Sequence, residues 1–338
     1  MRRMKPTSNS GSKVSPKSGS KPSAPTSGRK FRSGFVCILG RPNAGKSTLL
    51  NALAGQKIAI VSPKPQTTRN RVQGILNLAK RKSQPAAQII LIDTPGVHTA
   101  ANALSRRMMQ EVREALNGCD VIFLITDATR KLDAGDQAAL DLVKRSATPV
   151  FLLLNKIDKT DKQKLLPLIE EYRALHNFKE IIPLSALKKD GFGELLGATV
   201  AALPEGQPYF PEDQITDLPL RFMVAEAIRE QVLYATKEEV PHSTSVVIER
   251  FEEGARLTRI AAAIFCERTG QKAILVGHAG QMLKQIGTKA RHEIESLVGT
   301  KVYLELFVKV QDRWRDSERF VEGLDWRRQL ADLAAAPK

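Results

Sequence analysis

The sequence predicts a doubly wound α/β domain followed by a smaller α+β domain. From Phe35 to about Leu203, continuous apolar runs of strand length alternate with helical segments, which is typical of a parallel sheet buried on both faces. A glycine-rich loop, Gly40–Ser47, lies between the first apolar run and the first helical segment. After a proline-punctuated stretch near Tyr209, the strand-like segments alternate apolar and polar residues instead.

Composition restricts the classes of protein that the chain can represent. Of its 338 residues, 42% are apolar, which is enough for a buried core. The cysteines Cys37, Cys119 and Cys266 are far apart, and this predicts a reduced protein without disulfides or a zinc knuckle. The net charge is +16, and residues 1–34 hold nine Lys/Arg and no acidic residue. Because residues 1–33 carry almost nothing apolar, we expect them to form a disordered basic tail.

Five apolar runs are the expected strands of the first domain. These runs are Phe35–Leu39, Ile89–Ile92, Val121–Ile125, Val150–Leu154 and the shorter Ile181–Leu184. Helical segments between them include Ser47–Ala54, Ser105–Asn117 and Asp136–Ser146. Since the carboxyl ends of parallel strands meet at one edge of a sheet, polar motifs that follow these runs are expected to share a site.

The loop between the first strand and the first helix matches G-x-x-x-x-G-K-[ST]. In this context the backbone N–H groups and the helix N-terminus are expected to bind a triphosphate. The Lys46 ammonium would reach the β- and γ-phosphates, and the Ser47 hydroxyl would hold Mg²⁺. The expected nucleotide-binding residues are Gly40, Arg41, Pro42, Asn43, Ala44, Gly45, Lys46, Ser47 and Thr48. The alternative, a chance glycine turn, is disfavoured by the motifs downstream.

Three further motifs follow predicted strands. They contribute Asp93, Thr94, Pro95 and Gly96, then Asn155, Lys156 and Asp158, then Ser185 and Ala186. The Asp93 carboxylate can hold Mg²⁺ through water, and the Gly96 amide can meet a γ-phosphate. The Asp158 carboxylate can accept hydrogen bonds from N1–H and the 2-amino group of guanine, a donor pair that adenine lacks. A backbone amide at Ser185-Ala186 can reach the guanine O6. Alone, each motif is a weak signal, but in this order they resemble the G1, G3, G4 and G5 elements of GTPases.

The polar, proline-broken stretch Pro63–Arg71 falls where switch I of a GTPase is expected. A threonine there would complete the Mg²⁺ shell, and we favour Thr67, with Thr68 as the alternative. The predicted metal-binding residues are thus Ser47, Thr67 and Asp93, and the predicted catalytic residues are Lys46, Thr67 and Gly96. Val97 occupies the position where Ras-type enzymes have a water-orienting glutamine. We therefore expect slow hydrolysis, or another positive charge such as K⁺ bound with the help of Asn43.

The second domain is expected to contain an amphipathic helix, a hairpin, a glycine loop, a second helix and a final strand. The predicted elements are a helix at Leu220–Tyr234, strands at Ser243–Phe251 and Leu257–Glu267, a third short strand at Lys272–Val276, a helix at Gln281–Val298 and a strand at Lys301–Val310. This order resembles a type II KH domain, in which a G-x-x-G loop clamps a single-stranded backbone. The expected divisions are a tail at 1–33, an α/β domain at 34–205, a linker at 206–217, the KH domain at 218–312 and a C-terminal helix and tail at 313–338.

The G-x-x-G loop is predicted to bind RNA. From residue 268 to residue 291 the chain has five basic residues and no acidic one, which indicates a local patch for phosphates. The expected RNA-binding residues are Gly277, His278, Ala279, Gly280, Lys284, Lys289 and Arg291. The alternative is an ordinary tight turn before a helix.

From about Gly34 to Asp325 the chain resembles the Era family of GTPases. The resemblance rests on Gly40–Ser47, Gln66–Arg69, Asp93–Gly96, Tyr209–Asp217, Ile286–Arg291 and Leu304–Val310. It implies a P-loop GTPase domain followed by a type II KH domain, with GTP, GDP and Mg²⁺ as ligands. It also implies a monomeric bacterial protein that hydrolyses GTP, binds 16S ribosomal RNA near its 3′ end and assists assembly of the 30S subunit. Family members are cytoplasmic, with peripheral contact to the cytoplasmic face of the inner membrane.

Two features depart from the family pattern, and two other functions compete. The tail at 1–33 is an extension, and His278-Ala279 stands where family members usually have Lys or Arg. A tRNA-modification GTPase has a similar P-loop, but that class needs an N-terminal cofactor domain and a helical domain that this chain does not fit. A non-enzymatic RNA-binding protein with a decayed GTPase is disfavoured because the five residues Lys46, Ser47, Asp93, Asn155 and Asp158 are intact.

Overall fold

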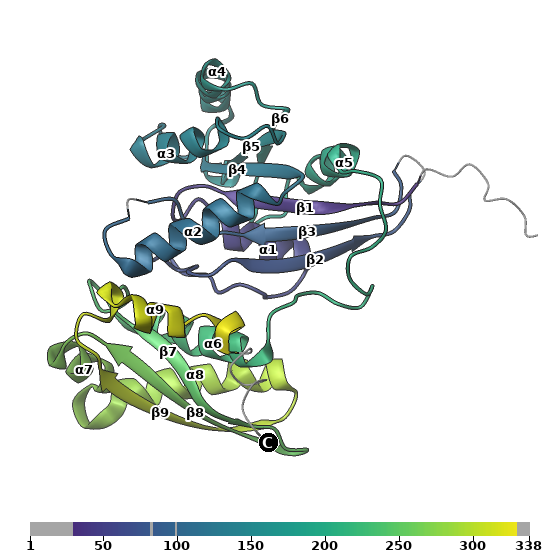
Figure 1. The fold of residues 1–338 in the computed structure, drawn as a ribbon. Coiled ribbons are helices and arrows are strands. Elements are labelled where there is room, and N and C mark those ends of the chain that lie inside the picture. Colours follow the sequence, from purple (N-terminus) through teal and green to yellow (C-terminus); the bar gives the residue numbers. More distant parts are fainter. Residues whose placement is uncertain (1–29, 82–83, 99, 330–338) are drawn as a thin grey trace, which may run out of the picture.

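The computed structural model describes residues 30–81, 84–98 and 100–329. These residues form two sheets, each with its own helices and buried core (Figure 1). The expected basic tail, up to residue 29, and the last residues, from 330, lie outside the described residues. The first strand begins at Arg32, so Arg32 and Ser33, which the sequence placed in the tail, belong to the sheet.

In the described part of the chain, six strands form the first sheet in the order β2-β3-β1-β4-β5-β6. β2 runs antiparallel to β3, and every other neighbouring pair is parallel. The strands are β1 (Arg32–Leu39), β2 (Val72–Leu78), β3 (Ala87–Asp93), β4 (Val121–Asp127), β5 (Val150–Asn155) and β6 (Glu180–Leu184). The parallel order brings the carboxyl ends of β1, β3, β5 and β6 to one edge, where the predicted motifs follow.

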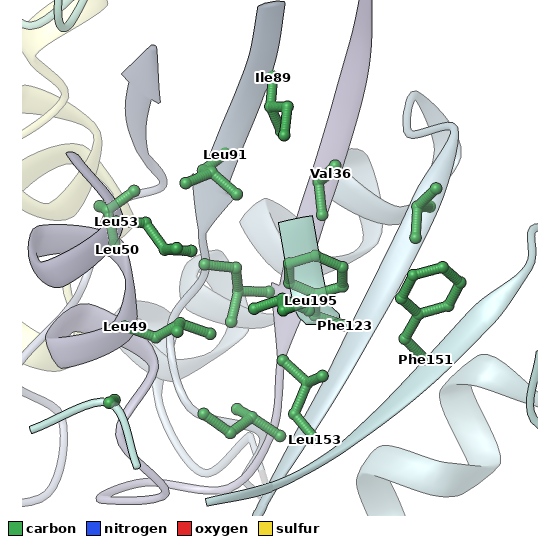
Figure 2. Close-up of a cluster of buried hydrophobic side chains, with 14 of the residues drawn as sticks. Val36, Leu49, Leu50, Leu53, Ile89, Leu91, Phe123, Phe151, Leu153 and Leu195 are labelled. Atoms are coloured by element: carbon green, nitrogen blue, oxygen red, sulfur yellow. The ribbon is translucent and has the colours of Figure 1, made fainter. Parts of the chain in front are cut away.

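Helices cover both faces of this sheet, as the sequence predicts for a doubly wound fold. They are α1 (Lys46–Ala54), α2 (Ala103–Asn117), α3 (Ala134–Val143), α4 (Leu165–Leu175) and α5 (Phe192–Ala202), with single 3-10 turns η1 (Ile157–Lys159) and η2 (Lys162–Lys164). Leu49 of α1 and Leu195 of α5 pack with Phe123 and Phe151 in one core (Figure 2). A second core joins the opposite face to α2, α3 and α4. Packing on both faces therefore fixes the ends of the strands relative to one another.

The edge strand β2 is absent from the sequence prediction. Its residues Val72–Leu78 do not form a continuous apolar run, because an edge strand is buried less than its neighbours. The segment expected to be a linker lies along this strand. Ile75 N–H donates to Ile215 O (2.8 Å), and the Thr216 hydroxyl donates to Gln73 O (2.6 Å). The connection between the two sheets is thus bound to the first domain through its backbone.

The second sheet has three strands within the described residues, in the order β7-β8-β9. β7 and β8 are antiparallel, and β8 and β9 are parallel. The elements are α6 (Leu220–Ala235), β7 (Ser245–Glu252), β8 (Leu257–Cys266), α7 (Thr269–Val276), the 3-10 turn η3 (His278–Gly280), α8 (Gln281–Val298) and β9 (Lys301–Val310). Buried residues of α6 and α8, such as Ile228 and Ile286, pack against the sheet.

The prediction of a third short strand at Lys272–Val276 is wrong. These residues belong to α7, which begins at Thr269 after an N-cap at Arg268. A run of five residues cannot distinguish a strand from one buried helical turn, and here only Leu275 is buried. The G-x-x-G loop therefore connects two helices, α7 and α8.

After β9 the chain returns to the first domain. The 3-10 turn η4 (Trp314–Asp316) and α9 (Glu318–Gly323) pack on α2 (Figure 1). Trp314 is fully buried there with Leu104 and Met108, and its indole N–H donates to Ser243 O (2.8 Å). The second domain consequently packs against the helix that follows the Asp93–Gly96 motif.

Candidate functional site

The loop Gly40–Ser47 wraps around the start of α1. Its turn places Asn43 and Gly45 in the left-handed region, with φ values of 62° and 106°. Because α1 begins at Lys46, the free N–H groups of its first turn point into the loop. The result is a ring of backbone donors suited to phosphate oxygens, as the sequence predicts.

Lys46 is buried inside this loop. Its ammonium donates to Gly40 O (3.1 Å) and Arg41 O (2.9 Å). Burial lowers the pKa of Lys46 to about 8, although the Asp93 charge acts in the opposite direction. Two carbonyls only partly compensate a buried cation, so an anion in the loop would be a better partner.

Three oxygen ligands converge beside Lys46. The Ser47 hydroxyl donates to Asp93 Oδ2 (2.6 Å) and lies 2.8 Å from the Thr68 hydroxyl, which is 3.1 Å from the same carboxylate oxygen. Asp93 is fully buried, and burial raises the pKa of its carboxyl. Among the described residues, Asp93 Oδ1 has no hydrogen-bond partner. Hard oxygen ligands with one unmatched carboxylate oxygen fit Mg²⁺.

The prediction of Thr67 as the switch I ligand does not match this geometry. The Thr67 hydroxyl donates to Lys64 O (2.7 Å) and lies 2.9 Å from the Ser62 hydroxyl, so it supports the loop from within. Thr68 is the residue beside Ser47 and Asp93. Both threonines line the cavity at the phosphate loop, and the sequence does not indicate which hydroxyl meets Asp93.

The rest of the Asp93–Gly96 motif is fixed against the phosphate loop. The Thr94 hydroxyl donates to Ile38 O (2.8 Å), and Val97 N–H donates to Gly40 O (3.2 Å). Gly96 approaches the loop so closely that a Cβ would lie 2.7 Å from the ring of Pro42. Pro95 and Val97 are buried, so the position expected to orient water carries an apolar side chain.

The predicted base-binding residues surround a cavity of 150 Å³. Gly45, Thr48, Asn155, Lys156, Asp158 and Ala186 are among its lining residues. The Asn155 amide nitrogen donates to Ala44 O (2.8 Å), which joins this cavity to the phosphate loop. Asp158 Oδ1 accepts a hydrogen bond from the Ser185 hydroxyl (2.6 Å), and this leaves the second carboxylate oxygen for a base.

The backbone amides of Ser185 and Ala186, one of which is expected to reach guanine O6, both make hydrogen bonds within the protein. Ser185 N–H donates to Asp190 O (3.2 Å), and Ala186 N–H donates to Asn155 Oδ1 (2.9 Å). Both N–H groups are therefore already used within the protein. Leu187, the next residue, also lines the cavity.

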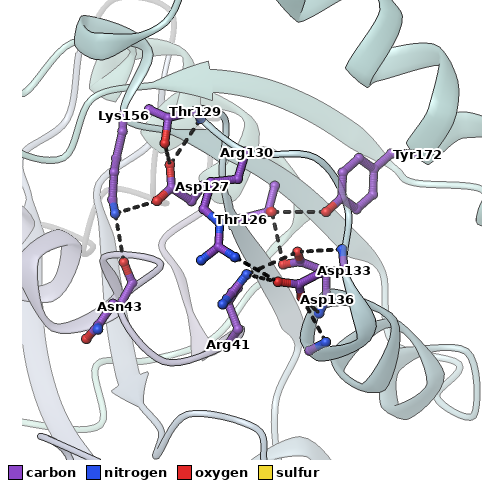
Figure 3. A network of polar contacts seen from close by, with 11 residues as sticks. Arg41, Asn43, Thr126, Asp127, Thr129, Arg130, Asp133, Asp136, Lys156 and Tyr172 are labelled. Atoms are coloured by element: carbon purple, nitrogen blue, oxygen red, sulfur yellow. Dashed lines mark hydrogen bonds and ion pairs between the residues drawn. The ribbon is translucent and has the colours of Figure 1, made fainter. Parts of the chain in front are cut away.

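The backbone of Arg41 belongs to the phosphate loop, but its side chain, predicted to bind nucleotide, lines neither cavity. Its guanidinium pairs with Asp133 and lies 3.8 Å from Asp136, at the start of α3 (Figure 3). Asp136 Oδ1 accepts from the Thr126 hydroxyl (3.1 Å), which in turn accepts from the Tyr172 hydroxyl (3.0 Å). This network, which sequence reasoning missed, ties the phosphate loop to α3 and to strand β4.

The G-x-x-G loop has the backbone that its glycines permit. Gly277 and Gly280 have φ values of 71° and 78°, and a Cβ on Gly277 would lie 2.6 Å from Met282. Apart from its chain neighbours, no heavy atom of the described residues lies within 4 Å of a Cβ built on Gly280, which leaves that position open for a ligand. A groove of 360 Å³ begins there and is lined by Gly280, Leu283, Lys284, Gly287, Thr288, Arg291, Leu304 and Leu306. His278, Ala279 and Lys289 are exposed and lie outside this groove.

Replacement of Arg41 by alanine is expected to destabilise the nucleotide-free protein by about 1–2 kcal/mol, because it leaves Asp136 buried without its nearest cation. Arg130→Ala provides a matched control, since Arg130 pairs with the same Asp133 from an exposed position. It should cost less than about 0.5 kcal/mol. Thermal unfolding of both variants compares these values, and equal effects would contradict the positioning role of Arg41.

Both domains match known protein families. A family model described as a 50S ribosome-binding GTPase matches residues 35–156, and a KH domain model matches residues 239–315. GTPase Era of Geotalea uraniireducens is 48% identical over 295 residues, which cover 87% of this chain and 97% of the relative. GTPase Era of Geobacter metallireducens is 46% identical over 298 residues, covering 88% and 98%.

Two solved structures are similar over nearly their whole length. Both have a TM-score of 0.82 and 42% identity, and the match covers 86% of this chain and 98% of each structure. One is a variant of Aquifex aeolicus Era bound to GDP and AlF4⁻, and the other is Era with MgGDPNP and nucleotides 1506–1542 of 16S ribosomal RNA. With a GTPase domain that carries the phosphate loop and a KH domain that carries the G-x-x-G groove, the chain belongs to the Era family of GTPases.

Proposed function

We propose that this chain binds GTP with Mg²⁺ at the edge of its first sheet, hydrolyses it, and binds 16S ribosomal RNA near its 3′ end during assembly of the 30S subunit. The observation that carries the proposal is the convergence of Ser47, Thr68 and Asp93 beside Lys46. The Era structure with MgGDPNP and 16S nucleotides supports it by similarity. In this proposal, the state of the nucleotide alters RNA binding.

The residues around the phosphate loop have separate roles in this function. Lys46 would exchange its two carbonyl acceptors for phosphate oxygens, which relieves its burial. Ser47, Thr68 and Asp93 would hold Mg²⁺, with Asp93 Oδ1 as the available acceptor. When bound, Mg²⁺ neutralises negative charge on the phosphates. Gly96 would place its amide at the γ-phosphate, since its backbone lies against Pro42.

Asp158 is proposed to select guanine. Asp158→Asn should weaken GTP binding at least about tenfold and improve binding of xanthosine triphosphate, because an amide N–H repels the guanine donors and matches the 2-oxo group. Competition with a fluorescent nucleotide measures both affinities. Asp161→Asn is the matched control, since Asp161 is exposed and does not line the base cavity. Full GTP preference in Asp158→Asn would show that the guanine assignment is wrong.

We also propose that K⁺ stabilises the negative charge that develops in the transition state, since Val97 is buried and cannot orient the attacking water. The Asn43 amide nitrogen donates to Pro63 O (2.9 Å), and this leaves its Oδ1 available to a cation. The steady-state GTPase rate should be several times higher in KCl than in NaCl at equal ionic strength. Equal rates in the two salts would contradict a role for K⁺.

The G-x-x-G groove is proposed as the RNA site, with Lys284 and Arg291 at its wall and Lys289 nearby. Lys284→Ala should weaken binding of a single-stranded 16S fragment and flatten its salt dependence by less than about one unit. Gly280→Asp should weaken binding more, because it adds bulk and negative charge where the groove begins. Fluorescence anisotropy measures both effects.

Gly55→Asp provides the matched control for this experiment, because it adds the same charge at the same left-handed backbone. Gly55 is exposed at the C-terminal end of α1 in the other domain, with a φ of 74°, and apart from its chain neighbours no heavy atom of the described residues lies within 4 Å of a Cβ built there. Unchanged RNA affinity in a folded Gly280→Asp variant would exclude the groove as the RNA site.

Peripheral membrane contact and a monomeric state, both implied by the family resemblance, stay predictions. Of the described helices, none combines the length and the apolar character needed to cross a bilayer.

A further inference from the structure

A residue of the KH domain lines the nucleotide cavity. The cavity at the phosphate loop has a volume of 290 Å³, and its wall combines Ser47 and Lys46 with the switch segment from Ile60 to Thr68. Tyr234 of α6 completes this wall. Its hydroxyl donates to Val61 O (2.8 Å), so the contact joins the two domains at the edge of the cavity.

The peptide groups of Val61 are held from both sides by the same helix. Glu230 Oε1 accepts a hydrogen bond from Val61 N–H (2.9 Å), while Tyr234 donates to Val61 O. Glu230 and Tyr234 are four residues apart, so they lie on one face of α6. Because both backbone groups of Val61 bind one rigid helix, the position of Ile60–Pro63 over the cavity depends on α6.

Further contacts of the KH domain hold this segment in place. Glu230 is 3% exposed and pairs with Lys57, which also pairs with Glu293 of α8. Arg229 donates to Thr67 O, at the far end of the segment. The KH domain thereby contacts the chain just before this segment, at Lys57, and near its end, at Thr67.

The wall is also closed from the side of the phosphate loop. Asn43 donates to Pro63 O, two residues after Val61. The segment is therefore held on both sides, by Asn43 of the phosphate loop and by Tyr234 of α6. If nucleotide leaves past this wall, contacts that fix the segment would slow its release.

We propose that Tyr234 and Glu230 are positioning residues of the nucleotide site, through which the KH domain sets the residence time of the bound nucleotide. The inference rests on the GTP site proposed above. Neither side chain needs to touch the reacting phosphate. Their effect is exerted through Val61, whose backbone they hold above the cavity.

Tyr234→Phe in the full chain tests the inference, because it removes one hydroxyl and keeps the ring. Release of mant-GDP, followed by stopped-flow fluorescence with excess GDP, should be roughly two- to tenfold faster, the range expected for one net hydrogen bond. The KM for GTP should rise while kcat does not fall, because faster release of nucleotide does not slow the chemical step. A residue that only stabilised the fold would lower the melting temperature without this difference between KM and kcat.

Tyr303→Phe is the matched control. Tyr303 is 48% exposed and Tyr234 is 55% exposed, but Tyr303 lies on β9 and its hydroxyl contacts Glu305 (3.4 Å). Its removal should leave mant-GDP release unchanged. Glu230→Gln is a second variant, because it keeps an acceptor for Val61 N–H and removes the ion pair with Lys57. It should accelerate release less than Glu230→Ala.

The outcomes separate this inference from the proposed function. If the wild-type chain fails to bind mant-GDP, the proposed GTP site is wrong and the inference falls with it. If the wild-type chain binds normally and Tyr234→Phe releases mant-GDP at the wild-type rate, only the inference is overturned. Faster release in Tyr234→Phe, with Tyr303→Phe unchanged, supports the positioning role.

Discussion

The buried carboxylate of Asp93 is the constraint on which the nucleotide site depends. A charge with no exposure to water needs compensating partners, and here they are the hydroxyls of Ser47 and Thr68 and the nearby ammonium of Lys46. Lys46 and Ser47 belong to the phosphate loop, and Thr68 belongs to switch I. The phosphate loop, switch I and the end of β3 must therefore meet at this carboxylate, and the parallel pairing of β1 with β3 fixes two of them relative to each other.

The second constraint is a buried cation between the domains. The Arg69 guanidinium donates to Thr244 O (2.6 Å) and His242 O (3.1 Å) and lies 5.7 Å from the centre of the Trp314 ring. Burial, and then the neighbouring charge of Arg229, lower the pKa of Arg69 to about 9. Such a group is costly to bury unless carbonyls surround it. Arg69 follows Thr68 directly in switch I, and its side chain is bound by carbonyls of the KH domain. Thr68 at the metal site therefore cannot move independently of that domain.

The predictions from sequence fail where two outcomes fit the local sequence equally well and tertiary packing selects one of them. Thr67 and Thr68 have the same chemistry and adjacent positions, but only Thr68 faces Asp93. Arg41 belongs to the phosphate-loop motif, but Asp133 and Asp136 draw its side chain toward α3. The short run Lys272–Val276 fits a strand as well as a helix, and its place between β8 and α8 makes it a helix.

The sequence by itself determined which motifs the chain carries and the order in which they follow the strands. The spacing of the glycines, Lys46 and Ser47 defines a phosphate loop, because this motif needs only neighbouring residues in a strand-loop-helix context. The parallel strands, Asn155 and Asp158 at a strand end, and the G-x-x-G loop before α8 also follow from local pattern. Tertiary structure alone decided which groups face one another across the domains. Tyr234 and Val61 are separated by 173 positions, and no local period relates residues so far apart. Their contact exists because α6 packs against switch I, and that arrangement is set by burial and hydrogen bonding over the whole interface.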